Sequence, residues 1–156
     1  MKYSSELITW SSTFSCGIKL IDGQHKEFIT LVNEMFCHAT GNEEQEHEYF
    51  SKVIKKAVHH IKVHFATEEK IMRTIHYPGY AEHKRDHDSF VFEILGNIRD
   101  YETEKHYTLY SFTKYLKEWI LSHIGVMDKQ YFLYLKKMVV ARKAGGRSRD
   151  VSADIA

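Results

Sequence analysis

Four separate stretches of the sequence repeat apolar residues at the 3.6-residue spacing of an amphipathic helix. These stretches begin near Ile21, Asn42, Tyr80 and Leu109. The chain has a single proline, Pro78, so little interrupts long helices. Because the connections between the stretches are short, neighbouring helices are expected to pack antiparallel. The pattern predicts an all-α fold, an up-down-up-down antiparallel four-helix bundle.

Capping and helix-breaking residues set the expected ends of the helices. The first helix is predicted over residues 21–38, the second over 42–77, the third over 80–101 and the fourth over 109–125. Asp22 is placed to cap or to open the first helix. Acidic residues in the first turn favour the start of the second helix, because they complement the helix dipole.

Two further segments flank the predicted bundle. Residues 1–20 have no sustained period and are interpreted as an ordered N-terminal arm. Three apolar side chains of this arm are expected to fold back onto the core: Trp10, Phe14 and Ile18. A short C-terminal helix is predicted over residues 131–140. We expect one domain, residues 1–141, followed by a basic and disordered tail, residues 142–156.

Composition narrows the class of protein. A chain of 156 residues with 43% apolar and 28% charged residues is expected to fold as one globular domain, and no run approaches the ~20 apolar residues of a membrane span. A net charge of +1 gives no long-range attraction for nucleic acid or an anionic membrane. The N-terminus lacks the pattern of a signal peptide, and Cys16 and Cys37 form no C-x-x-C pair. We expect a cytoplasmic protein without a thiolate metal site, nucleic-acid partner or membrane span.

The 11 histidines are the most unusual part of this composition. A buried imidazole without a partner loses hydration free energy, so amphipathic helices normally keep histidine off the apolar stripe. Here every predicted helix carries at least one on that stripe, and the second helix adds a carboxylate. In chain order these residues are His25, His64, Glu68, His83, His87 and His123. In an up-down bundle their positions all lie at the same end, so we expect them to converge.

The spacings of these residues suit metal ligation. Two pairs are four residues apart and therefore share a helix face: His64 with Glu68, and His83 with His87. Asp128 follows His123 by five residues, which on a regular helix is ~140° around the axis. A helix that ends or distorts at Gly125 would return Asp128 to the core.

The donor set of five imidazoles and two carboxylates is too large for one ion and sufficient for two. If both carboxylates bridge, one metal has three histidines and two oxygens, and the other has two histidines and two oxygens. A solvent-derived oxo or hydroxo bridge completes six and five ligands. Six-coordinate nitrogen and oxygen sites suit iron or manganese, whereas zinc prefers four ligands. We predict a di-iron centre with one open position on the two-histidine metal.

At this point the sequence resembles the haemerythrin family, in particular its bacterial members. The resemblance covers about residues 10–135, and all seven metal-ligand positions of the family hold the expected residue type. The matching stretches are Trp10, Gly17-Ile18, Ile21-Asp22-Gly23-Gln24-His25-Lys26, His64-Phe65, Glu68-Glu69, Met72, Tyr80, His83, His87, Trp119-Ile120, His123-Ile124 and Asp128-Lys129.

The resemblance implies a role for each of the seven residues. The closed iron is bound by His83, His87 and His123, the open iron by His25 and His64, and the two are bridged by Glu68 and Asp128. The implied function is reversible dioxygen binding for carriage, storage or delivery, and not an enzymatic activity. Ile120 stands where the family has an aliphatic residue lining its O2 pocket. We expect four apolar residues to wall this pocket: Ile120, Ile124, Phe28 and Ile29.

Two alternatives stay open at this stage. A ferritin-like di-iron oxidase uses a Glu-x-x-His motif on two helices, and only residues 44–47 offer that spacing, once. Five neutral imidazoles with two carboxylates also supply less negative charge than an oxidase site, which favours binding O2 and releasing it. A stand-alone sensor of O2, nitric oxide or redox state would use the same site and act for a partner. The partner of the protein, an O2-using enzyme or a signalling protein, stays open. Glu69 is expected to point away from the site, and His60 to be a hydrogen-bonded histidine at the edge of the core.

Overall fold

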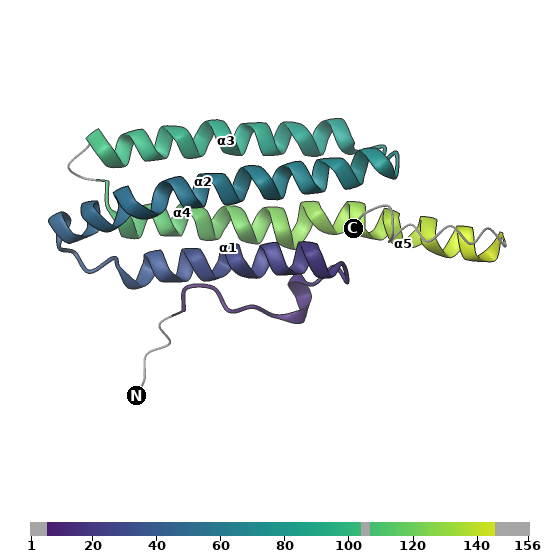
Figure 1. Cartoon of the computed structure of the whole chain (residues 1–156), viewed down its shortest axis with the longest axis horizontal. Coiled ribbons are helices and arrows are strands. Elements are labelled where there is room, and N and C mark those ends of the chain that lie inside the picture. The colour runs from purple at the N-terminus through teal and green to yellow at the C-terminus, as the bar shows by residue number, and fades with distance from the viewer. Residues whose placement is uncertain (1–5, 104–106, 146–156) are drawn as a thin grey trace.

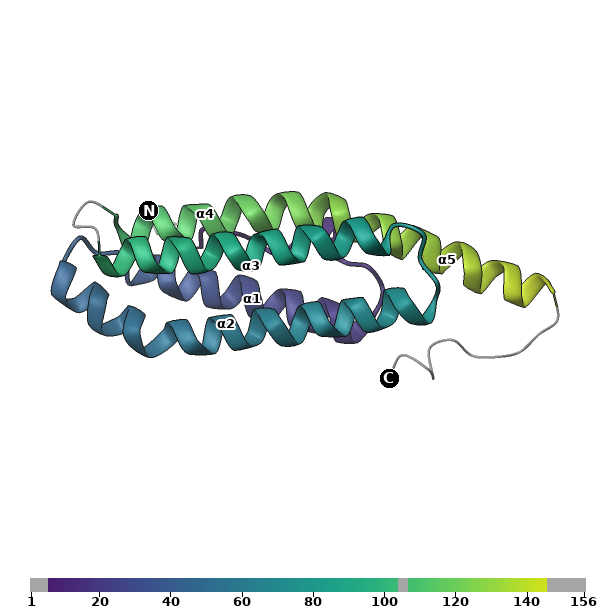
Figure 2. The same cartoon turned by 90° about the horizontal axis from the view of Figure 1, so that it is seen from above.

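The computed structural model describes residues 6–103 and 107–145, and every regular element among them is helical (Figure 1). Four long helices lie side by side in both views (Figures 1 and 2). They are α1 (Lys19–Cys37), α2 (Glu43–Thr74), α3 (Tyr80–Thr103) and α4 (Leu109–Ser122). Each runs antiparallel to the one before it. The predicted up-down-up-down four-helix bundle is therefore confirmed.

The starts of α1 and α2 are stabilised differently. Asn42 caps α2, since its side chain accepts a hydrogen bond from the Gln45 N–H at 3.1 Å. Asp22 lies in the first turn of α1, where its carboxylate accepts from the Ser15 hydroxyl at 2.6 Å and from the Cys16 N–H at 2.9 Å. Asp22 thus connects the N-terminal arm to α1, and no side chain caps the N-terminus of this helix.

The N-terminal arm is ordered over its described part and packs against the bundle. It contains one short 3₁₀ helix, Ser12–Phe14. The Asn33 side chain of α1 accepts from the N–H groups of Leu7 and Ile8, both at 2.9 Å, and donates to the Ile8 carbonyl at 2.8 Å. These bonds hold Ile8 in the core. The three side chains expected to fold back are partly buried against apolar clusters: Trp10, Phe14 and Ile18.

A π-helix, η2 (His123–Met127), joins α4 to α5 (Asp128–Ala144), so the three form one continuous helical rod that extends past the bundle (Figures 1 and 2). The distortion predicted at Gly125 is confirmed. The predicted C-terminal helix is present, but it begins at Asp128 because the π turn keeps the chain helical. Residues 142–144 belong to α5 and not to the predicted tail, since alanine, arginine and lysine favour helix. Residues 146–156 lie outside the described part.

Apolar side chains fill the bundle interior and fix the start of α5. Ile21 of α1, Ile71 and Met72 of α2, and Tyr131 and Phe132 of α5 form one buried cluster. This packing anchors α5 beside the ends of α1 and α2, next to the histidine-bearing end. Within the described ranges, no helix has the length and apolar character needed to cross a bilayer.

Candidate metal centre

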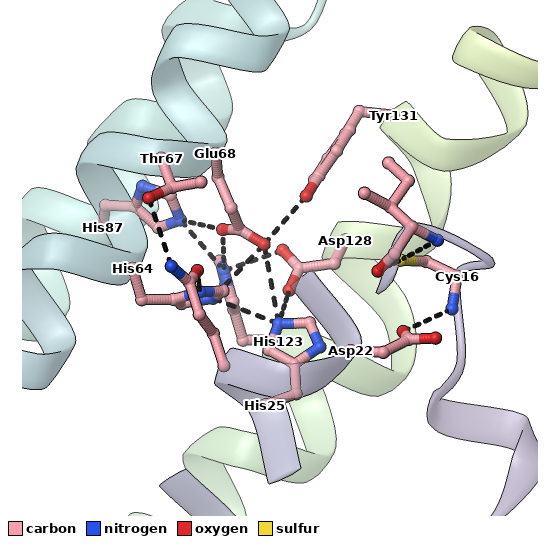
Figure 3. A network of polar contacts seen from close by, with 12 residues as sticks. Cys16, Asp22, His25, His64, Thr67, Glu68, His87, His123, Asp128 and Tyr131 are labelled. Atoms are coloured by element: carbon pink, nitrogen blue, oxygen red, sulfur yellow. Dashed lines mark hydrogen bonds and ion pairs between the residues drawn. The ribbon is translucent and has the colours of Figure 1, made fainter. Parts of the chain in front are cut away.

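Seven polar side chains meet inside the end of the bundle where α1 and α3 begin and α2 and α4 end. Figure 3 labels all of them except His83. All seven are at least 94% buried: His25, His64, Glu68, His83, His87, His123 and Asp128. The convergence predicted from helix topology is confirmed. No other clustered set of metal-ligand side chains was found in the described ranges.

The ligand atoms of these residues form two overlapping groups. One group contains Glu68, His83, His87, His123 and Asp128, and the other contains His25, His64, Glu68 and Asp128. Within each group all ligand atoms lie within 4.8 Å of one another. Both carboxylates belong to both groups, so the geometry offers two unequal binding positions that share two residues.

Glu68 turns a different oxygen toward each group. Its Oε1 lies 3.3 Å from His64 Nε2 and 3.6 Å from His25 Nε2. Its Oε2 lies 3.1 Å from His87 Nε2. A carboxylate with this orientation can bind one ion through each oxygen.

Asp128 divides its oxygens in the same way. Its Oδ2 is 3.2 Å from His25 Nε2, while its Oδ1 is 3.1 Å from His83 Nε2 and 2.9 Å from His123 Nε2. The π turn makes this possible, because the Asp128 N–H donates to the His123 carbonyl five residues earlier. Five residues therefore span about one turn, which places Asp128 on the same face as His123.

Opposite charges hold this cluster together when no metal is bound. Burial disfavours the charged carboxylates, but the surrounding imidazoles outweigh it and lower the pKa of both Glu68 and Asp128. Burial likewise opposes protonation of His25, yet the two carboxylates raise its pKa to about 9. For His123, burial is outweighed by Asp128, Asp86 and Glu68, which raise its pKa to about 11. Protons thus balance the buried negative charge, and metal ions would displace them.

Several atoms of the cluster are better placed to bind a metal ion than to hydrogen-bond to one another. Glu68 Oε2, His83 Nε2 and both Asp128 oxygens are buried and make no well-formed hydrogen bond among the described residues, although each lies 2.9–3.2 Å from another ligand atom of the cluster. Buried polar atoms almost always make a hydrogen bond, so four together in one place require an explanation. Imidazole nitrogens and carboxylate oxygens are donors that iron and manganese accept. The residues present therefore fit a pair of such ions.

Three polar side chains contact the outer nitrogens of the histidines, and sequence reasoning missed their roles. Each accepts a hydrogen bond from an Nδ1–H: Asp86 from His123 at 2.5 Å, Glu69 from His87 at 3.2 Å, and Gln24 from His64 at 2.7 Å. The expectation that Glu69 points away from the site is wrong, because its carboxylate reaches across to α3. These bonds leave each Nε2 free to face the cluster centre.

Tyr131 is a further contact that the sequence did not reveal. Its hydroxyl donates to Glu68 Oε1 at 2.9 Å, and the whole side chain is buried (Figure 3). Its ring packs edge-to-face on His83 with centroids 5.4 Å apart. Tyr131 lies three residues after Asp128 on α5, in an apolar stretch. This spacing places both residues on the same helix face, and it was the one sign in the sequence that Tyr131 lies near the cluster.

The remaining sequence predictions concern the surroundings of the cluster. His60 donates through Nε2 to the Gln24 carbonyl at 3.0 Å, which confirms a hydrogen-bonded histidine at the core edge. The four residues proposed for an O2 pocket are all buried in the main apolar cluster: Ile120, Ile124, Phe28 and Ile29. Their role as pocket walls remains a prediction.

Comparison with known proteins gives the class. The profile described as "Hemerythrin HHE cation binding domain" matches residues 16–135. Bacteriohemerythrin of Methylococcus capsulatus is 27% identical over 127 residues, covering 80% of this chain and 94% of that relative. Bacteriohemerythrin of Stenotrophomonas maltophilia is 28% identical over 125 residues, covering 80% and 79%.

Solved structures agree with the sequence matches. A wild-type hemerythrin crystal structure superposes with a TM-score of 0.69 at 27% identity, covering 80% of this chain and 95% of that one. The fold, the buried cluster of histidines and carboxylates, and these matches define a cation-binding helical domain. The chain belongs to the haemerythrin family.

Proposed function

We propose that the protein binds dioxygen reversibly at two non-haem irons held by the seven clustered side chains. The observation that carries this proposal is the sharing of Glu68 and Asp128 between a group of three histidines and a group of two. Such a division gives one position with five protein ligands and one with four. Iron, when bound, supplies the electrons and the open coordination position that dioxygen needs.

The protein's contribution is first to hold the ligands in place. Tyr131 keeps Glu68 oriented through its 2.9 Å hydrogen bond, and the π turn keeps Asp128 on the cluster face. The aromatic ring of Phe65 stacks on His87 with centroids 3.8 Å apart, and Trp119 stacks on His123 at 4.4 Å. These contacts restrict the imidazoles to one orientation before any metal arrives.

Its second contribution is to exclude water. Ile120 is fully buried one turn before His123, and Ile124 follows directly after it. Phe28 and Ile29 lie one turn after His25 and are also buried. Apolar side chains at these positions would keep away the water and protons that help to expel bound oxygen in reduced form.

A ferritin-like oxidase is disfavoured by the position of its motif. The only Glu-x-x-His spacing, Glu44 to His47, lies at the start of α2, at the opposite end of the bundle from the cluster. There His47 stacks on Tyr101 with centroids 4.7 Å apart. As metal ligands, the cluster would supply two carboxylates and five neutral imidazoles, a set that favours release of dioxygen over its reduction.

A sensor role is the second candidate, and one observation favours it. α5 carries Asp128 at its first residue, and it runs nine residues past the end of the family match. A change at the metal centre could therefore be passed to a partner along α5. If the protein is a sensor of this kind, the rate of trypsin cleavage at Lys136 and Lys137 should differ between the reduced and the oxygenated protein. If it is only a carrier, the two rates should be equal.

Metal analysis and absorption spectroscopy together test the proposed function. Protein produced with ample iron should contain two irons per chain. The anaerobically reduced protein should gain a new visible absorption in air and lose it under argon. A single metal per chain, or zinc in preference to iron, would overturn the assignment. Continuous O2 consumption without a reversible spectrum would indicate the oxidase.

A further inference from the structure

The histidines of the two groups are backed by chemically different partners. In the three-histidine group, Asp86 accepts from His123 Nδ1 and Glu69 accepts from His87 Nδ1, and both acceptors are carboxylates. In the two-histidine group, the neutral amide of Gln24 accepts from His64 Nδ1. His25 Nδ1 is buried and has no hydrogen-bond partner among the described residues. Among residues 6–103 and 107–145, no carboxylate is hydrogen-bonded to Nδ1 of His25 or His64.

We propose that Gln24 is a positioning residue that would favour the ferrous state of an iron held by the two-histidine group, because it gives His64 a neutral partner. The inference rests on the proposed di-iron function and adds the residue that sets the difference between the two metals. An imidazole whose Nδ1–H is held by a carboxylate is a stronger electron donor to its metal. Stronger donation favours the ferric ion, so the neutral amide favours the ferrous ion on the side that binds dioxygen.

A chain of hydrogen bonds fixes which end of the Gln24 amide faces His64. The Thr67 hydroxyl donates to the Val63 carbonyl at 2.8 Å, so it accepts from Gln24 Nε2 at 3.3 Å. The amide oxygen is then left for His64 Nδ1 at 2.7 Å. His64 Nε2 faces the cluster, where a metal needs its lone pair, so Nδ1 must carry the proton. The Thr67 hydroxyl, Gln24 Nε2 and His64 Nδ1 thus each donate to an acceptor.

The backbone of Gln24 is held as well. His60 donates to its carbonyl at 3.0 Å, and the His60 ring stacks on Phe28 with centroids 6.0 Å apart. Gln24 is only partly exposed, next to His25 in α1. The amide is therefore placed by α2 on one side and by its own helix on the other, as a positioning role requires.

Two isosteric exchanges separate an electronic role from a merely structural one. Gln24→Glu gives His64 a carboxylate partner, and Asp86→Asn gives His123 a neutral one. If the partners act through imidazole donation, the two variants should shift the reduction potential of the di-iron centre in opposite directions. If they only support the fold, both should lower stability and neither should shift the potential in a charge-dependent way. Gln45→Glu makes the same exchange at an exposed site at the far end of α2 and serves as the control.

The experiment is spectroelectrochemical titration of the iron-loaded protein, with iron content and urea unfolding measured for every variant. We expect Gln24→Glu to raise the preference for ferric over ferrous iron about tenfold, a shift of about 59 mV to lower potential. Asp86→Asn should shift it to higher potential, and Gln45→Glu should leave it unchanged. Gln24→Ala, which loses the positioning contact, should weaken iron binding by roughly 10–100-fold.

The outcomes distinguish this inference from the proposed function. Shifts of the same sign in Gln24→Glu and Asp86→Asn, or no shift in Gln24→Glu with two irons bound, would overturn the role of Gln24. A wild type that fails to bind two irons would instead overturn the proposed function. If Gln24→Glu fails to fold, iron binding by Gln24→Ala decides, since unweakened binding would contradict a positioning role for Gln24.

Discussion

Replacing Tyr131 by phenylalanine removes one atom from the candidate metal centre and leaves the ring in place. The lost hydroxyl donates to Glu68 Oε1 at 2.9 Å. Burial, together with the charges of Glu68 and Asp128, raises the pKa of Tyr131 well above its usual value, so the hydroxyl keeps its proton and donates. Tyr131 is fully buried, so water cannot easily replace the donor. The substitution therefore leaves a buried carboxylate with one hydrogen bond fewer.

The size of the effect follows from the charge of the acceptor. A hydrogen bond to a charged group contributes about 1.5–3 kcal/mol to stability. Since phenylalanine fills the same ring volume, no packing cavity adds to the loss. For a chain of this length each kcal/mol corresponds to roughly 2–4 °C in melting temperature. The metal-free variant should therefore melt about 3–12 °C below the metal-free wild type.

Urea unfolding of the metal-free proteins measures this difference directly, because an unchanged slope shows that only stability has changed. Tyr134→Phe is the matched control, since Tyr134 lies on the same helix and packs on Tyr77 with centroids 5.4 Å apart. Its loss should stay within about 0.5 kcal/mol. Equal losses in the two variants, or no loss in Tyr131→Phe, would refute the reasoning.

Three further predictions follow from the cluster. Metal analysis should show that Glu68→Ala and Asp128→Ala each lose both irons, whereas Glu69→Ala should retain them with affinity weakened by roughly 10–100-fold. Equal iron retention in all three variants would contradict this prediction. Ile120→Ala should lose roughly 2–5 kcal/mol of stability and speed the decay of the oxygenated spectrum in stopped-flow, and an unchanged decay would remove this residue from the pocket. Folding raises the pKa of His25 from its ordinary value of 6.5 to about 9. The protonated side chain therefore stabilises the metal-free protein fully at pH values below 6.5, and this contribution is lost as the pH rises through about 9. Melting temperatures should therefore fall over that range without iron and stay level with iron, which replaces the protons.

Much of the fold and of the cluster could be predicted because both depend on periodicity. The 3.6-residue spacing gave four helices, and the connections gave their directions. Charged and titratable residues on an apolar stripe stand out in the sequence, as Glu68 does between Ile61 and Met72. Asp128 could be placed because the spacing from His123 required a distortion at Gly125. Apart from the helix directions, these inferences concern positions within one helix.

The contacts between helices could not be predicted in the same way. Gln24, Glu69 and Asp86 lie beside the stripes, where polar residues are usually solvated. Asp86 keeps 39% of its side chain exposed and still accepts the His123 Nδ1–H. Its role depends on how α3 and α4 are rotated relative to each other, and the spacing of residues along one helix does not determine that rotation. Tyr131 was hidden for another reason, because tyrosine on an apolar stretch is ordinary in a core.

The π turn allows a last prediction, because it is equivalent to one residue added to a regular helix. Deleting Gly125 should restore i→i+4 bonding and leave Asp128 four residues from His123, still on the same face. The rest of α5 keeps its orientation, so Tyr131 still reaches Glu68, and the variant should bind two irons. Deleting the exposed Gln130 is the opposite case, since it turns everything after it by about 100° relative to Asp128. That deletion should break the Tyr131 hydrogen bond and lower stability. Iron analysis and urea unfolding of both variants test the idea, and loss of iron on deleting Gly125 would show that the wide turn itself is needed to place Asp128.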